Sequence, residues 1–378
     1  MTEPLRFGLL TYGLDRPLAG IGRSVLELGW ALARRPDCAP LFLTPYGSGP
    51  FTDDGLAHAR LRGARLLPAL MSVGALQVPA VAHRYSLPLV HDPTGVSPFL
   101  LGRWAGRYKR IVTLHDAIAF RYPEGYTRLN NFLHRHYVPA TLKHVDAVIT
   151  VSEAARDDLV RFLGCPDDRV HVVPWATSAA FRVLPAEAAA RVVRRYGLQP
   201  PFVLHVGALQ ARKNLPTLLR AFAHLRQEAP DVTLAIAGRP TWHFAEIPQT
   251  VEALGLGGAV HFLGYVADAD LPALYNAASV FSFPSLYEGF GLPVLEAMAC
   301  GTPVVCSDAS ALPESAGGAA LLVDPYDHRA LADALGQVLS DQALADELRR
   351  RGLARAARFS WDRTAELTLA IYRRVLEE

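Results

Sequence analysis

The sequence is poor in cysteine, and its charges almost cancel. Among 378 residues there are four cysteines, and 38 lysines and arginines stand against 36 aspartates and glutamates. The cysteines, at positions 38, 165, 300 and 306, form no CxxC pair and no cluster with zinc-ligand spacing, so we expect no disulfide framework and no metal site. A net charge of +2 argues against general nucleic-acid binding, because neutralising phosphates needs a strongly basic surface.

Long hydrophobic runs are scarce as well. Residues 66–82 come nearest to a membrane span, but Pro68 and Pro79 interrupt them, and a spanning helix needs about 20 apolar residues. We expect this stretch to be buried core. The alternative is a helix in the membrane interface, which usually carries Lys or Arg on its polar face, and none occurs inside this stretch. The N-terminus lacks the basic and apolar regions of a signal peptide, so we expect a cytoplasmic protein.

Apolar residues are plentiful, at 51%, and the length favours two or three domains. Short apolar runs alternate with longer segments of helical period, which predicts βαβ units and parallel sheets in an α/β fold. A proline-containing stretch at 175–201 divides the runs into two series. The expected strands are 6–10, 41–44, 89–91, 110–114, 147–151 and 170–173 in the first series, and 202–206, 232–237, 260–263, 280–283, 304–306 and 320–323 in the second.

The near-zero net charge hides a difference between the halves. Residues 1–180 contain 20 basic and 15 acidic side chains, whereas residues 181–378 contain 18 and 21. The basic first half suits weak peripheral contact with the inner face of a membrane, or an anionic acceptor; a mixed, solvated surface is the simpler alternative.

One motif follows the expected strand 280–283. Gly289 and Gly291 allow a tight turn, and Pro293 marks the start of a helix, whose first N–H groups attract anions. Glu288 and Glu296 flank this turn, and because carboxylates repel phosphate, we expect them to accept hydrogen bonds from sugar hydroxyls. Alternatively, Glu288 caps the helix and Glu296 is solvated.

A second motif follows the strand 202–206. Gly207 permits close approach of a ligand to the backbone, and Arg212 with Lys213 places two positive charges before a helix. Positive charge at a helix N-terminus opposes the helix dipole, which favours a diphosphate ligand over the alternative of a solvated basic pair.

These two motifs, together with TLLRAF after Asn214, LPALYNAASVF at 271–281 and ACGTPVV at 299–305, resemble retaining glycosyltransferase family 4. The resemblance implies the GT-B fold, in which two Rossmann-like domains face each other across a cleft and the C-terminal one holds most of the nucleotide sugar. It also implies that the last helix, 361–378, returns to the first domain. We therefore expect an N-terminal domain of residues 1–176 with 361–378, and a C-terminal domain of residues 177–360.

The resemblance also implies roles for single residues of the second half. Arg212 and Lys213 would bind the diphosphate and stabilise the leaving group, and Glu288 would contact the transferred sugar. Glu296 would accept from the ribose. The remaining donor contacts would come from Gly207, Gly264, Tyr265, Phe290, Gly291 and Leu292, of which Gly264 and Tyr265 line the base and the last three offer backbone amides.

In the first half, Gly20, Gly22 and Arg23 resemble the family's glycine-rich loop near the acceptor, in a form common among its mannosyltransferase-like members. Ala19 replaces a glycine that the family often has. A dinucleotide fingerprint is the alternative, but Val25 stands where the third glycine belongs.

His115 and Asp116 follow the strand 110–114. An imidazole at the carboxyl end of a strand suits a hydrogen bond to a hexose hydroxyl or proton movement, and the family has a functional histidine at this kind of position. We therefore favour a catalytic His115 over a core histidine. Asp116 lies on the acceptor side, where it orients the loop or contacts the acceptor.

The expected function is transfer of a hexose from a nucleotide diphosphate sugar to a glycan or lipid-linked acceptor in cell-surface polysaccharide synthesis. The resemblance to mannosyltransferase-like members suggests mannose from GDP-mannose as this donor. No Asp or Glu is assigned as a nucleophile, so we expect front-face substitution. No Asp-x-Asp motif follows a strand in a place where it would bind the diphosphate, so we expect no metal cofactor. Two alternatives stay open: a GT-B enzyme acting on soluble sugars or sugar phosphates, and a catalytically silent protein that binds nucleotide sugars.

Overall fold

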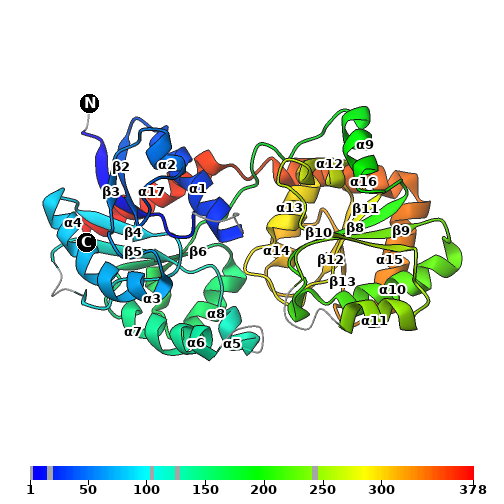
Figure 1. The fold of residues 1–378 in the computed structure, drawn as a ribbon, viewed down its shortest axis with the longest axis horizontal. Helices are drawn as coiled ribbons and strands as arrows, with labels where there is room; N and C mark the ends of the chain where they lie inside the picture. Colours follow the sequence, from blue (N-terminus) through cyan, green and yellow to red (C-terminus); the bar gives the residue numbers. More distant parts are fainter. Residues whose placement is uncertain (1–2, 15–19, 103–105, 124–127, 241–245) are drawn as a thin grey trace. The chain divides into compact units, whose positions relative to one another are not determined.

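The structure is a computed structural model that describes residues 3–14, 20–102, 106–123, 128–240 and 246–378. It divides into two compact units. The first unit contains Met1–Trp175 and Ser360–Glu378, and the second contains Ala176–Phe359. Each unit has a parallel sheet with helices packed on both faces (Figure 1).

The first unit has a seven-stranded sheet in the order β3-β2-β1-β4-β5-β6-β7. All its strand pairs are parallel. The strands are β1 (Leu5–Leu10), β2 (Cys38–Thr44), β3 (His58–Arg60), β4 (Leu89–Asp92), β5 (Lys109–Thr113), β6 (Ala147–Thr150) and β7 (Val170–Val172). The sequence did not predict β3, because this short edge strand buries one side chain, Ala59, between two exposed polar ones.

Helices of several lengths cover this sheet. They are α1 (Gly20–Ala33), α2 (Pro50–Asp53), α3 (Leu67–Ala69), α4 (Ala75–Arg84), α5 (Ile118–Arg121), α6 (Arg128–Phe132), α7 (Val138–Leu142), α8 (Glu153–Leu163) and α17 (Trp361–Glu377), with π-helical turns η1 (Leu70–Gly74) and η4 (Leu133–Tyr137) and the 3-10 turn η5 (Asp167–Arg169). The stretch 66–82 forms α3, η1 and most of α4, and contributes Leu70, Met71 and Val78 to the core. No helix among the described residues is long and apolar enough to cross a membrane.

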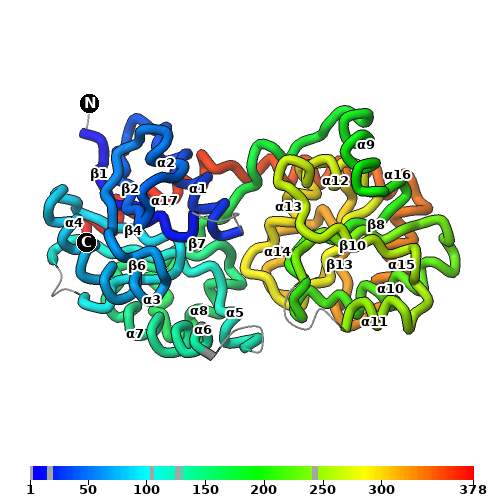
Figure 2. Tube along the Cα trace, in the orientation of Figure 1, coloured from blue at the N-terminus to red at the C-terminus, as the bar shows by residue number. Residues whose placement is uncertain are grey.

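The C-terminal helix α17 belongs to the first unit. Tyr372 is fully buried there, with its ring centroid 4.8 Å from that of Phe7 on β1, and its hydroxyl lies 2.6 Å from Nδ1 of His91 on β4. Figure 2 shows this last segment, in red, running beside the blue N-terminal strands. The end of the chain is thus part of the core that its beginning forms.

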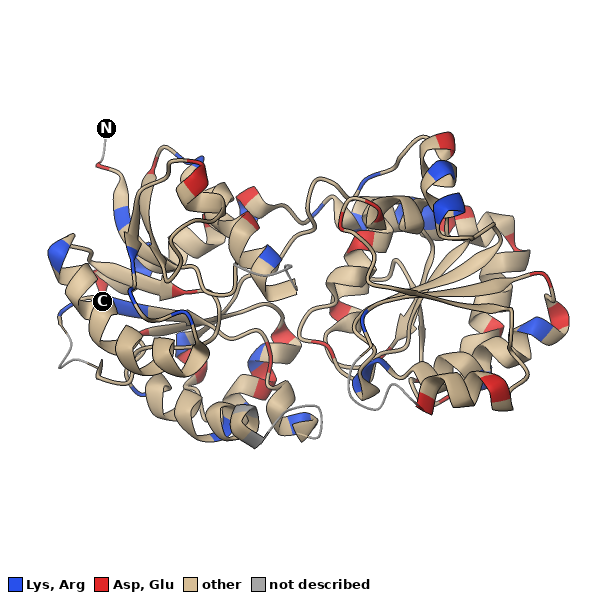
Figure 3. Ribbon diagram, viewed as in Figure 1, with Lys and Arg blue, Asp and Glu red and all other residues tan. Residues whose placement is uncertain are grey.

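The second unit has a six-stranded parallel sheet in the order β10-β9-β8-β11-β12-β13. Its strands are β8 (Phe202–Val206), β9 (Thr233–Ala237), β10 (Val260–Gly264), β11 (Val280–Phe283), β12 (Val304–Ser307) and β13 (Leu321–Val323). None of these strands contains Lys, Arg, Asp or Glu, as their tan arrows in Figure 3 show. Continuous apolar strands are typical of a parallel sheet covered on both faces.

The covering elements of the second unit lie between these strands and after them. They are α9 (Ala186–Arg195), η6 (Ala211–Lys213), α10 (Leu215–Glu228), α11 (Glu246–Ala253), α12 (Leu271–Ala277), α13 (Leu292–Ala299), α14 (Leu312–Ala316), α15 (His328–Ser340) and α16 (Gln342–Ala356). The chain runs outward from β8 on one side and from β11 on the other, so the strand order reverses between these two strands. Ligands of such sheets bind at the carboxyl ends of the strands that flank this point.

Candidate active site

Both charged motifs of the second half lie at the reversal point of the second sheet. The loop after β8 leads through Gly207 to η6 with Arg212 and Lys213, and the loop after β11 carries Glu288. Asn214 joins the two loops. Its side-chain Nδ2 donates to the carbonyl oxygens of Pro284, at 3.1 Å, and Pro325, at 2.6 Å.

Arg212, Lys213 and Glu288 form one cluster of charges. Oε1 of Glu288 accepts from Nη1 of Arg212 at 2.7 Å and from Nζ of Lys213 at 2.6 Å. Nη1 of Arg212 also donates to the Tyr287 carbonyl at 3.0 Å, and Nζ of Lys213 lies 4.4 Å from the centre of the Phe283 ring. Two cations share one carboxylate, so the cluster keeps an excess positive charge that suits a phosphate.

Burial and the neighbouring charges shift the pKa values of Lys213 and Glu288. Burial lowers the pKa of Lys213 to about 8, an effect that the carboxylate of Glu288 partly offsets. Burial alone would raise the pKa of Glu288, but the neighbouring Lys213 and Arg212 outweigh it and lower the pKa to about 2. At neutral pH all three groups are therefore charged.

Two serines, Ser310 and Ser315, hold the glycine turn that follows Glu288. The amide of Glu288 donates to Oγ of Ser310 at 2.8 Å, and the Ser315 hydroxyl donates to the carbonyl of Phe290. Gly291, at φ +110°, precedes α13, and a Cβ there would lie 2.8 Å from Leu312. The expected donor amides therefore belong to a turn with a fixed backbone.

Glu296 lies on α13, one turn into the helix. Its side chain is buried, and Oε2 accepts from the Tyr275 hydroxyl at 3.0 Å. Neither alternative role of the two glutamates fits this geometry. Glu296 is not solvated, and α13 starts at Leu292, after Gly291, without a side-chain cap from Glu288.

Gly264 and Tyr265 lie at the end of β10, two strands away from β8. Gly264 has φ +64°, and a Cβ at this position would have no atom within 4 Å of it, while the ring of Tyr265 is half exposed. Both residues thus border open space at the carboxyl edge of the sheet.

The expected acceptor-side residues belong to the first unit. Gly20, Gly22 and Arg23 form the first turn of α1, whereas Ala19 lies outside the described residues. Oδ1 of Asp116 accepts from the Ile118 amide at 3.0 Å, which holds the loop that leads into α5.

His115 follows β5 and packs against Trp175, with ring centroids 4.7 Å apart. Burial lowers its pKa to about 4, an effect that the Pro93 carbonyl partly offsets. Neither ring nitrogen makes a hydrogen bond of regular geometry. The imidazole is therefore neutral at pH 7, and its polar atoms have no strong competitor for a ligand hydroxyl.

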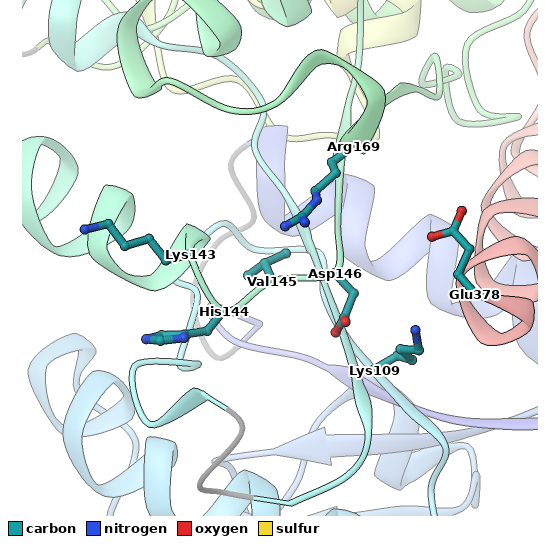
Figure 4. A pocket seen from close by; sticks show the side chains of 7 residues that line it. All are labelled: Lys109, Lys143, His144, Val145, Asp146, Arg169 and Glu378. Atoms are coloured by element: carbon teal, nitrogen blue, oxygen red, sulfur yellow. The ribbon is translucent and has the colours of Figure 1, made fainter.

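A pocket of the first unit lies away from these residues. Figure 4 shows it at the amino end of β5, β6 and β7, where Lys109, Lys143 and Arg169 alternate with Asp146 and Glu378. Its charges are mixed, and it lies at the opposite sheet edge from His115. Among the described residues no three or more His, Cys, Asp or Glu side chains come together as metal ligands.

Sequence reasoning did not assign roles to Asn214, Tyr275 or Ser310, which hold the charged cluster and the two glutamates in place. Asn214 has φ +57°, a conformation that asparagine tolerates better than most residues. The sequence itself offers only the residue type, an asparagine directly before the expected helix. Tyr275 reads as an ordinary core aromatic.

Two family descriptions match most of the chain. Glycosyltransferase Family 4 matches residues 18–181, and Glycosyl transferases group 1 matches residues 190–355. O-antigen chain mannosyltransferase B of Escherichia coli is 33% identical over 388 residues, which cover 98% of each protein. The chain belongs to glycosyltransferase family 4. It is therefore a glycosyltransferase, as the resemblance of its motifs predicted.

A further relative and two solved structures are similar to this chain. The serotype-specific mannosyltransferase WbdA of Escherichia coli is 33% identical over 278 residues, which cover 71% of this glycosyltransferase and 34% of WbdA. Sucrose-phosphate synthase from Thermosynechococcus elongatus is 26% identical, with a TM-score of 0.80 over 99% of both chains. HepE of Anabaena, solved with UDP and glucose, is 19% identical with a TM-score of 0.79, covering 98% of this chain and 99% of HepE. The predicted GT-B fold is confirmed.

Proposed function

We propose that this glycosyltransferase transfers mannose from GDP-mannose to a glycan in the synthesis of a cell-surface polysaccharide, with retention of configuration. The main support for a donor site is the cluster of Arg212, Lys213 and Glu288, which lies where the strand order of the second sheet reverses. The full-length similarity to an O-antigen mannosyltransferase favours mannose and a polysaccharide acceptor.

In this proposal the two cations hold the diphosphate and neutralise the charge that develops on the leaving group. Preorganised charges in a partly buried site are worth more than in water, and they need no reorganisation during the reaction. Arg212 and Lys213 thereby supply the charge neutralisation that a metal ion gives elsewhere, so we propose no metal cofactor. Glu288, fixed by both cations, is left to contact hydroxyls of the sugar, and Glu296 those of the ribose.

We propose that substitution occurs on the front face of the sugar, with a donor phosphate oxygen taking the acceptor proton. The neutral imidazole of His115, whose ring nitrogens are buried, would form a hydrogen bond with a hydroxyl of the hexose. A covalent glycosyl-enzyme trapped with a fluorinated donor would contradict this mechanism, since it requires a carboxylate nucleophile.

The donor test is transfer or slow hydrolysis from GDP-mannose, with UDP-glucose and ADP-glucose as competitors. Release of GDP by the wild type, lost in Lys213→Met, supports the proposal. No turnover of any donor, despite nucleotide binding, would instead identify a silent binding protein. Efficient transfer to free sugar phosphates but not to mannose-terminated oligosaccharides would favour the soluble-acceptor alternative.

We propose in addition that the first unit contacts an anionic membrane, where a lipid-linked glycan resides. The helical segment from α3 to α4 and the one from α6 to α7 are linked by a hydrogen bond: the Tyr137 hydroxyl donates to the Met71 carbonyl at 3.0 Å. They expose large apolar side chains, namely Leu66 (65%), Leu76 (65%), Leu129 (56%) and Phe132 (59%). Residues 55–91 and 125–145 contain several arginines and no Asp or Glu. Apolar side chains among cations alone favour an anionic lipid surface.

Sedimentation with liposomes tests this contact. We expect more binding to vesicles with phosphatidylglycerol than to pure phosphatidylcholine, and a loss of binding in Leu66→Gln/Leu76→Gln. Val183→Gln, which replaces an exposed apolar side chain of the second unit, is the control. Equal binding by both variants would contradict the proposed surface.

A further inference from the structure

Arg239 is a cation at the edge of the second sheet to which neither motif assigned a role. It follows β9, and its guanidinium lies 4.4 Å from the centre of the Tyr265 ring, which follows the neighbouring strand β10. Arg239 is exposed, and no carboxylate of the described residues forms a salt bridge with it. A guanidinium on an aromatic face keeps the N–H donors along its edge free to point outward.

The backbone that carries Arg239 is fixed. Its carbonyl accepts from the Leu209 amide at 3.0 Å, and the Gly238 amide donates to the Gly264 carbonyl at 2.8 Å. Gly238 touches the loop after β8 so closely that a Cβ there would lie 1.8 Å from the Gly207 carbonyl oxygen. Three consecutive strand-end loops are thus joined, and the side chain of Arg239 projects from a rigid support.

The position of Arg239 suits the far end of a nucleotide. The loop after β8 leads to the diphosphate cluster, and β10 lies two strands further along the sheet, which is about 10 Å at the usual strand spacing. A ribose and one phosphate bridge a gap of this size. A ligand whose diphosphate is held by Lys213 therefore brings its base to the pair of Arg239 and Tyr265.

We propose that Arg239, held over the ring of Tyr265, selects a guanine base by donating two hydrogen bonds to its O6 and N7. Guanine presents two adjacent acceptors on this edge, whereas adenine presents N7 beside an amino donor that would face the guanidinium. Uracil lacks N7. This inference rests on the proposed nucleotide-sugar donor and names the residue that sets its base.

The test is calorimetric titration of the full chain with GDP, IDP, 7-deaza-GDP, ADP and inorganic pyrophosphate. We expect GDP and IDP to bind alike, since both carry O6 and N7, and ADP and 7-deaza-GDP to bind more weakly. A bidentate arginine contact is worth roughly 5- to 150-fold in affinity. Arg239→Met keeps the apolar stem and removes the donors, so it should lose this factor for GDP and bind GDP and 7-deaza-GDP equally.

Two controls separate the base contact from other effects. Pyrophosphate should bind the wild type and Arg239→Met equally, and Tyr265→Phe, which keeps the aromatic face, should retain the preference for GDP. Tighter binding of ADP or UDP than GDP, or parallel losses for GDP and pyrophosphate in Arg239→Met, would overturn the inference and leave the donor site standing. If pyrophosphate and every nucleotide bound the wild type no better than Lys213→Met, the proposed function itself would fail.

Discussion

The ammonium nitrogen of Lys213 lies 2.6 Å from Oε1 of Glu288, and the side chains are only 6% and 11% exposed. Neither group can lose its partner cheaply, because a buried charge left alone costs about 3–5 kcal/mol. The pair therefore fixes both a cation for the diphosphate and a carboxylate for sugar hydroxyls.

Lys213→Ala and Glu288→Ala should each reduce kcat strongly, by about 100-fold or more, since each removes a preorganised charge from the site. Circular dichroism and melting curves would show that both variants keep the fold, with a lowered Tm. Glu347→Ala is the control, because its salt bridges to Arg350 and Arg351 are on the surface and worth little. Near-normal transfer by either site variant would contradict the donor site.

The lowered pKa of Lys213 predicts a pH limit for donor binding. Burial brings this pKa to about 8, so the ammonium form predominates near pH 7 and is lost as the pH rises through 8. The affinity for GDP should fall above pH 8, by up to tenfold per unit. In Lys213→Arg the guanidinium stays charged, and this alkaline decline should vanish even if binding is weaker. A decline of equal size in both proteins would point to another group.

Most strands of the two sheets were predictable because they are short runs of apolar residues. Every strand of the second sheet is free of Lys, Arg, Asp and Glu, and such runs between helical segments are recognisable without a structure. The edge strand β3 was missed, since His58 and Arg60 are solvated and only Ala59 is buried. Its three residues lack the apolar run by which the other edge strands, β7, β10 and β13, could be recognised.

The charged residues of the candidate site could likewise be read from the sequence, but their supports could not. Lys213 and Glu288 are charged residues in glycine-containing loops that follow strands, whereas one partner of Glu296 is a tyrosine 21 positions earlier. Arg239 meets Tyr265 only because β9 and β10 pair in the sheet. Contacts of this kind depend on strand register, which no local pattern specifies.

Tyr275→Phe tests whether the tyrosine positions Glu296 toward the ribose. The substitution removes the one hydroxyl and leaves the buried carboxylate without this donor, which costs about 1–3 kcal/mol. We expect the KM for the donor to rise about 5- to 10-fold, with a smaller change in kcat. With 2′,3′-dideoxy-GDP as ligand, wild type and variant should bind alike. An equal loss for GDP and the dideoxy analogue would indicate a purely structural tyrosine.

Gly238→Ala should destabilise the second unit. The added Cβ would lie 1.8 Å from the Gly207 carbonyl oxygen, so the loops after β8 and β9 must separate. Overpacking of this kind costs about 1–3 kcal/mol, and occasionally more. Gly257→Ala is the matched control, because no atom lies within 4 Å of its Cβ position. Urea unfolding of both variants measures the difference, and equal midpoints would show that the two loops yield without cost.

Tyr372→Phe should loosen the C-terminal helix from the first unit. The wild-type hydroxyl lies 2.6 Å from Nδ1 of His91, whose Nε2 lies 2.8 Å from Oγ1 of Thr113, so both ring nitrogens of this buried imidazole are paired. Phenylalanine fills the same space but leaves Nδ1 without a partner, at a cost of about 1–3 kcal/mol.

Amide hydrogen exchange should therefore quicken in α17 and in β1 and β4 beneath it, while the second sheet is unaffected. Tyr326→Phe, at a side chain that is 72% exposed, should change neither sheet. Unchanged exchange in α17 would mean that its packing against Phe7, and not the hydrogen bond, holds the helix in place.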